Sequence, residues 1–338
     1  MKYQHIVFDK IKTRLSDPKD LVEQIMLALN LSKSSCYKRL RGESLLTLDE
    51  LAILMREFDL SYDEIVFTEK EKVGFRFPYK NQEIKNFFDY VGPLKDFVLK
   101  ARDIPGLTVH YAINEFPFFF YFHDKDLTHF KFFTFAQTVW NISSYKAAKF
   151  SLDEFNEWPL IEPDILLIQK GYYKIPNVEI WNSGVLLNTL NQIKYLLQAG
   201  FFKYPEEALV LCDKLDQVIN HISRMAEVGQ KFLIGQDPAS ATAKFEMFHN
   251  EIAHTNNILL LKAPDFNQIY FAYDNPNYII TDEENILKYT VDWFETIKKI
   301  ALPISQAADK NRRAFFSQIH KQIEYTRSQI KSIIRLEV

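Results

Sequence analysis

The sequence contains only two cysteines, Cys36 and Cys212, among its 338 residues. Two thiols cannot build a disulfide framework, and nothing near them has the ligand spacing of a zinc site. Glycine is also scarce: there are nine glycines and no G-x-G pair, so the glycine-rich loops of dinucleotide-binding and P-loop enzymes are not expected. We therefore expect no cofactor and no metal, and we expect a reducing compartment, the cytoplasm.

Long apolar runs and a strong net charge are missing as well. The longest uncharged stretches, such as residues 132–145, are shorter than the roughly 18 apolar residues that a membrane span needs. The amino-terminal residues carry charges throughout, so we expect neither a secretory signal nor a membrane partner. The 41 basic and 44 acidic side chains give a net charge of −3. Any attraction to nucleic acid must therefore be local.

What is present is an ordinary globular composition, with 47% hydrophobic and 25% charged residues. The length exceeds one typical domain of about 150 residues, so more than one core is expected. Six of the twelve residues in 69–80 are charged, and the segment includes a glycine and a proline and lacks a helical period, which is typical of a linker. The sequence thus predicts a small domain over 1–68, a linker over 69–80 and a larger domain over 81–338.

The larger domain is predicted to be mostly helical. Its residues 108–140 include twelve aromatic side chains, which suit either core packing or a small-molecule effector pocket. Residues 164–182 are compatible with helix or strand, whereas 257–281 predict a small antiparallel sheet. The expected fold class is mainly α: an N-terminal helix-turn-helix domain and a larger, mostly helical domain with a small antiparallel β element.

Two amphipathic helices of the larger domain are candidates for self-association. Apolar residues recur at spacings of three and four within 205–235 and within 309–335, and such a stripe must pack against another helix. We expect these stripes to carry a homodimer, which would make this a dimerisation or sensor domain that takes a small-molecule or protein effector. The stripe residues are Leu211, Leu215, Val218, Ile222, Phe316, Ile319, Ile323 and Ile330.

The small domain carries the clearest functional signal, in residues 20–42. One helix can present Ile25 inward and end at Asn30, and Ser32 can cap a second helix whose Cys36 returns to the same core. Residues 32–42 hold four basic residues and no acid, whereas 43–69 hold eight acids and one base. This pattern is that of a helix-turn-helix with a basic outer face.

From Leu21 to Ile65 the chain resembles the Cro/repressor-type (XRE-like) helix-turn-helix family. The run NLSKSSCYKRLRG stands where that family has G-V-S-x-S-T-I-S-x-W-x-x-G, and Arg39 occupies its frequent tryptophan position. The following TLDELAILMREFDLSYDEI matches the fourth and fifth helices of the family. The resemblance implies that double-stranded DNA is the partner. It assigns the DNA-binding residues as Ser32, Lys33, Ser34, Ser35, Tyr37, Lys38, Arg39 and Arg41.

These features together predict a sequence-specific DNA-binding transcriptional regulator. No catalytic triad or paired carboxylate has a local signature, so we expect no enzymatic activity. The stretches HDKDLTH (123–129) and HNEIAH (249–254) contain metal-ligand residue types, but neither has the spacing of an established metal motif. One alternative is a helix-turn-helix used as a protein-docking module in a defence or antitoxin-like complex. Another is an unrecognised enzyme in the larger domain.

Overall fold

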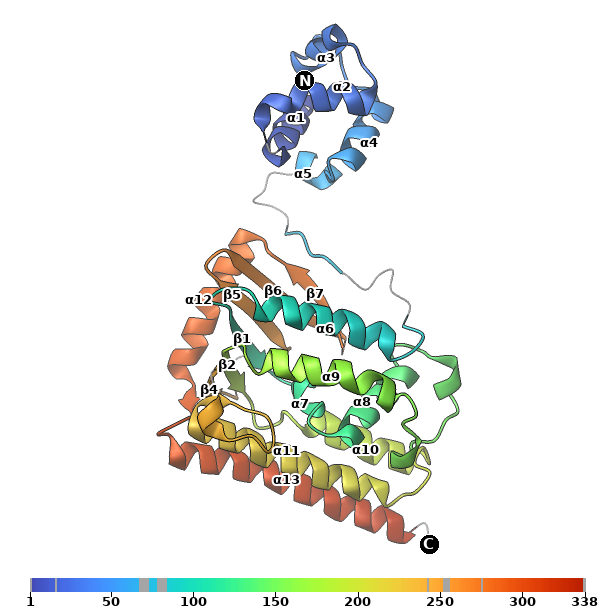
Figure 1. The fold of residues 1–338 in the computed structure, drawn as a ribbon, viewed down its shortest axis with the longest axis vertical. Helices are drawn as coiled ribbons and strands as arrows, with labels where there is room; N and C mark the ends of the chain where they lie inside the picture. Colours follow the sequence, from blue (N-terminus) through green and yellow to red (C-terminus); the bar gives the residue numbers. More distant parts are fainter. Residues whose placement is uncertain are drawn as a thin grey trace. The chain divides into compact units, whose positions relative to one another are not determined.

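The computed structural model describes residues 2–15, 17–66, 73–77, 84–241, 243–251, 256–274 and 276–336. The chain divides into two compact units, Met1–Gly74 and Phe75–Val338 (Figure 1). Most of the predicted linker lies outside the described residues. Within it, the backbone N–H of Arg76 donates to the carbonyl of Ile280 at 2.7 Å, and the reverse bond measures 2.8 Å. This part of the linker therefore pairs with the second unit.

Short helices build the first unit around one small core. They are α1 (Lys2–Arg14), α2 (Leu21–Leu29), α3 (Lys33–Leu40), α4 (Leu48–Glu57) and α5 (Tyr62–Val66), with a 3₁₀ turn at Pro18–Asp20. Ile11, Ile25 and Leu54 are fully buried in that core. A capping box begins α4, because Thr47 and Glu50 each accept a hydrogen bond from the other's backbone N–H.

The second unit is organised around one mixed sheet. Its strands are β1 (Thr108–Ile113), β2 (Asn177–Trp181), β3 (Gln230–Lys231), β4 (Ala243–His249), β5 (Ile258–Ala263), β6 (Phe266–Asp274), β7 (Asn277–Thr281) and β8 (Leu302–Pro303). Their order is β3-β4-β2-β1-β5-β6-β7, and β8 pairs with β4. Strands β4, β2 and β1 run parallel, while β5, β6 and β7 form an antiparallel meander that continues from β1.

This sheet shows that the predicted mainly α fold class is wrong: the second unit is an α/β fold with an eight-stranded sheet. The expected small antiparallel element exists as β5–β7, but it is only one side of a larger sheet. The parallel strands were missed because helices cover both of their faces, which removes the alternation of apolar and polar residues. All five residues of β2 are buried, including Asn177 and Glu179.

Helices pack on both faces of the sheet. They are α6 (Phe88–Arg102), α7 (Phe118–Tyr121), α8 (Lys125–Gln137), α9 (Trp158–Tyr172), α10 (Leu187–Gln198), α11 (Glu207–Val228), α12 (Glu284–Ile300) and α13 (Asp309–Leu336). On one face, Tyr111 and Ile113 of β1 join the large core that most of these helices share. On the other face, Ala112 packs in a separate core with Phe294 and Ile297 of α12. Side chains along a strand alternate sides, so β1, β2, β4, β5 and β6 contribute to both cores.

The two stripes predicted to carry a dimer are used inside a single chain. Helices α11 and α13 lie side by side and contact each other (Figure 1). All eight predicted dimer residues are buried in the large core: Leu211, Leu215, Val218, Ile222, Phe316, Ile319, Ile323 and Ile330. A helix stripe shows that a partner surface is needed but not whether another chain supplies it. These residues are therefore not an exposed dimer surface.

Candidate nucleic-acid interface

Two residues, Asn30 and Ser32, determine the turn between α2 and α3. Asn30 adopts a left-handed backbone with φ of 51°, and its N–H donates to the carbonyl of Met26, which ends α2. Asparagine tolerates this conformation better than most residues. Ser32 then caps α3, its hydroxyl accepting from the N–H of Ser35 at 3.3 Å. Buried Cys36 anchors α3 in the core, so the orientation of α3 is fixed.

A buried glutamine fastens the far end of α3 to α1. The amide nitrogen of Gln4 donates to the carbonyls of Arg39 at 2.7 Å and Ser44 at 2.9 Å. Its amide oxygen accepts from the N–H of Leu46 at 3.0 Å. These bonds satisfy three backbone groups of the α3–α4 connection, which an apolar side chain could not do. Gly42 lies in the same connection with φ of 75°, a conformation that costs glycine little.

One face of α3 is left open to solvent, and four of the predicted DNA-binding residues form it. Lys33, Ser34, Tyr37 and Lys38 are all exposed. Successive helical residues lie about 100° apart, so these four fall within about 140° of the helix circumference. In the described part of the chain neither lysine has an acidic partner. The face therefore presents two uncompensated cations, a hydroxyl and an aromatic ring.

Arg39, also predicted to bind DNA, points to the other side of α3. Its guanidinium donates to both carboxylate oxygens of Glu50, at 3.1 Å and 2.6 Å. Both side chains are only 16% exposed. Burial raises the pKa of Glu50, but bonds from Arg39 and Thr47 outweigh it and leave that pKa below its ordinary value. Arg39 thus ties α3 to α4.

The remaining predicted contacts differ in how available they are. Ser35 is half-buried and its hydroxyl accepts from that of Ser32 at 3.0 Å, so both hydroxyls are engaged at the start of α3. Arg41 is exposed but pairs with Glu43 at 2.7 Å. An exposed pair of this kind contributes about 0–1 kcal/mol, so Arg41 can exchange Glu43 for a phosphate at small cost.

A second group of polar residues, which sequence analysis missed, lies at the carboxyl ends of the parallel strands. Asn114, Asn182 and Asn250 directly follow β1, β2 and β4. This edge is where open α/β sheets bind ligands. The amide of Asn182 donates to Asn114 at 2.6 Å, and the hydroxyl of Ser183 accepts from the amide of Gln318 at 2.9 Å. An amide cannot act as a general base, so these contacts do not form a catalytic pair.

Two fully buried ionisable side chains, Glu179 of β2 and Lys231 of β3, lie within the sheet and both bond to Asn177. Glu179 accepts from Asn177 at 2.7 Å, from the Trp181 indole at 2.8 Å and from the Tyr172 hydroxyl at 3.2 Å. Lys231 donates to the carbonyl of Tyr172 at 2.6 Å and lies over its ring. Burial raises the pKa of Glu179 and lowers that of Lys231. Because both groups are fully bonded, we interpret this network as structural.

Neither histidine-containing stretch forms a metal site in the described part of the chain. No cluster of three or more histidine, cysteine, aspartate or glutamate side chains there could hold a metal ion. Half-buried His123 instead bonds to the hydroxyl of Tyr173, and its ring lies 5.1 Å from that of His221. His254 lies outside the described residues.

Comparisons of the whole chain with known proteins found nothing similar. Neither protein-family models, curated proteins nor solved structures gave a match. Within the described ranges, no helix combines the length and apolar character that crossing a membrane requires.

Proposed function

We propose that this protein is a sequence-specific DNA-binding transcriptional regulator in which α3 enters the major groove. The observation that carries the proposal is the open face of α3, where Lys33, Ser34, Tyr37 and Lys38 lie together with no acidic partner among the residues that the structure describes. A second helix held rigidly after a tight turn is the geometry by which helix-turn-helix proteins reach base edges. The fixed bonds around Asn30 supply that rigidity.

The side chains on this face suit the chemistry of base edges. Lysine donates to the O6 and N7 acceptors of guanine, and a serine hydroxyl can donate to or accept from several bases. Arg41 at the end of α3 and Ser32 at its start are placed to meet phosphates on either side of the groove. Few cations are involved, so nonspecific affinity should be weak and strongly reduced by salt.

We also propose that two copies bind DNA together. One recognition helix contacts only a few base pairs, and a two-fold pair of helices doubles the contacts at half-sites about one helical turn apart. Because the α11 and α13 stripes are buried within one chain, the two copies would meet through other surfaces. Sedimentation of the full chain with and without its duplex measures this: a mass of two chains on the duplex is expected, and one chain would contradict it.

The test of DNA recognition is selection from a pool of randomised duplexes by the full chain. The expected result is enrichment of a roughly palindromic sequence by the wild type and no enrichment by Lys33→Ala/Lys38→Ala. Lys100→Ala/Lys310→Ala, at exposed positions of α6 and α13, is the matched control for the loss of two positive charges and should enrich the same sequence. No enrichment by the wild type would overturn the proposal.

A second candidate function is docking of another protein onto the first unit. It is favoured by Leu45 and Leu48, which lie three residues apart beside the end of α3 and are 63% and 81% exposed, because neighbouring exposed apolar side chains mark interaction sites more often than single ones do. If selection fails, this candidate predicts that Leu45→Ser/Leu48→Ser releases a co-purifying protein that Lys33→Ala/Lys38→Ala retains. Retention of that protein by both variants would contradict it.

A further inference from the structure

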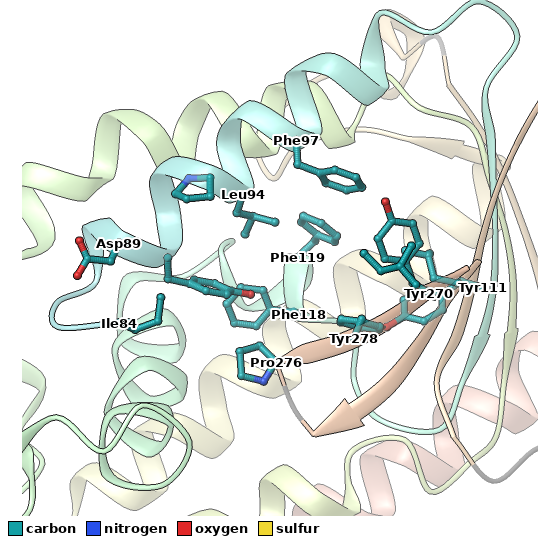
Figure 2. Close-up of a pocket in the computed structure, with 14 residues that line it drawn as sticks. Ile84, Asp89, Leu94, Phe97, Tyr111, Phe118, Phe119, Tyr270, Pro276 and Tyr278 are labelled. Carbon is teal, nitrogen blue, oxygen red and sulfur yellow. The ribbon is translucent and has the colours of Figure 1, made fainter. Parts of the chain in front are cut away.

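The second unit contains a cavity of about 290 Å³ between α6, the short helix α7 and the β5–β7 meander. Figure 2 shows aromatic rings converging on it from elements far apart in the sequence. The central ones are Tyr90, Phe97, Phe118, Phe119, Tyr270 and Tyr278. Phe118 and Phe119 belong to the aromatic-rich residues 108–140, and most of the aromatic side chains of that segment lie in the large core. The segment therefore supplies both the core and one wall of the cavity.

The volume of the cavity sets the size of a ligand. An apolar cavity of about 150 Å³ accommodates a single benzene ring. The cavity here has about 290 Å³, close to twice that volume, so a molecule of two fused rings fits. Ring faces and edges are both available, because Tyr90 meets Phe118 and Phe97 meets Tyr270 edge-on with centroids 5.6 Å apart in each pair. Aromatic ligands gain most from such walls.

The charges around the cavity disfavour an anionic ligand. Among the described residues that line it there is no lysine, arginine or histidine, and Asp89 is the one acid. Its carboxylate accepts from the backbone N–H groups of Lys85 at 2.8 Å and Asn86 at 3.2 Å. Figure 2 shows Asp89 at one end, away from the tyrosine cluster. An anionic ligand would be desolvated here without a counter-charge, which is costly.

One end of the cavity offers hydroxyl groups. The hydroxyls of Tyr111 and Tyr278 lie 3.3 Å apart, and Tyr270 lines the same end (Figure 2). Tyr111 is buried, which raises its pKa well above the ordinary value and keeps the phenol neutral. Neutral phenols can donate to or accept from a ligand hydroxyl or carbonyl. The cavity is thus apolar along its length with a hydrogen-bonding end.

We propose that this cavity is a binding site for an uncharged aromatic molecule of about two fused rings that carries one hydroxyl or carbonyl group. The rings lie between α6 and the meander, and the polar group lies at Tyr111 and Tyr278. Binding at this site does not depend on the proposed DNA function, since every lining residue belongs to the second unit.

The test is calorimetric titration of the full chain with 2-naphthol and with 2-naphthoate, an anion with the same rings. We expect saturable one-to-one binding of 2-naphthol, and binding of 2-naphthoate weaker by about tenfold or more, the penalty of an unpaired buried charge. No saturable binding of 2-naphthol, or equal affinity for both compounds, would overturn the proposal. This comparison uses the wild type alone and needs no variant.

Variants locate the site. Leu94→Trp places a large side chain in the cavity wall and should abolish 2-naphthol binding. Leu160→Trp, at a position 62% exposed on α9, is the matched control and should bind like the wild type. Tyr278→Phe removes one hydroxyl and should weaken 2-naphthol by about fivefold, the worth of about one neutral hydrogen bond. Unchanged binding by both Leu94→Trp and Tyr278→Phe would place the ligand elsewhere and refute the assignment.

Discussion

Replacing Arg39 by alanine should destabilise the first unit without removing a DNA contact. The guanidinium makes two bonds to Glu50, and both side chains are 16% exposed. Exposed ion pairs contribute about 0–1 kcal/mol and breaking a fully buried pair costs about 3–5 kcal/mol, so this intermediate case should cost about 2 kcal/mol. Lys38→Ala, one position away and exposed, should cost almost nothing.

Hydrogen exchange of the full chain measures this difference. A loss of about 2 kcal/mol should speed exchange of amides in α2–α4 by about thirtyfold at neutral pH. All four tryptophans lie in the second unit, so the unfolding transition seen by tryptophan fluorescence should not move. A change of less than about threefold would refute the stabilising role of the pair.

The same variant separates the structural role from a role in binding. At a temperature where exchange still shows a folded first unit, Arg39→Ala should bind DNA more tightly than Lys38→Ala. Equal loss of DNA affinity in both variants would show that Arg39 contacts phosphate.

The pKa of Glu50 is lowered in the folded chain, so the stability that Arg39 adds is present above about pH 4.5 and is lost at lower pH.

Three further predictions concern the second unit. Burial lowers the pKa of His129 to about 3, and its Nδ1 has no hydrogen-bond partner among the described residues. The unfolded chain therefore binds more protons between pH 6.5 and 3, and stability falls as the pH decreases through that range. His129→Phe should flatten this fall in urea titrations followed by tryptophan fluorescence, and an unchanged slope would contradict the assignment. Burial lowers the pKa of Lys131 to about 8 despite its bond to Gln192, so stability should rise by about 3 kcal/mol as pH increases from 8 to 10.5. Lys131→Met should abolish that rise in the urea midpoint, and an equal rise in both proteins would refute it. Bound 2-naphthol should slow amide exchange of Arg76 and Ile280, because Ile280 lines the cavity and pairs with Arg76; NMR exchange rates unaffected by saturating ligand would show that the cavity and the linker are uncoupled.

The first unit was largely predictable because its signals are local. Asn30 and Ser32 each act on backbone groups within four residues, and the structure shows both in the expected positions. Local signals did not predict that the Arg39 side chain turns away from the exposed face of α3 and toward α4. That depends on Glu50, eleven residues away on another helix.

The second unit was less predictable because its order is non-local. Strands β1, β2 and β4 are far apart in the sequence and are recognised as strands only through their pairing. The cavity likewise joins α7 to β6 and β7, about 150 residues later. The Leu211–Ile222 stripe was correctly placed on a helix, but sequence does not distinguish packing on α13 of the same chain from packing on a second copy.

The most direct test of the central claim is a titration of the full chain with its selected duplex and with a scrambled duplex of equal length. The account predicts that the wild type prefers the selected duplex by about a thousandfold or more. Lys38→Ala should lose at least about tenfold of that preference with no change in amide exchange. Equal wild-type affinity for the two duplexes, or an unchanged preference in Lys38→Ala, would contradict the claim that α3 recognises DNA sequence.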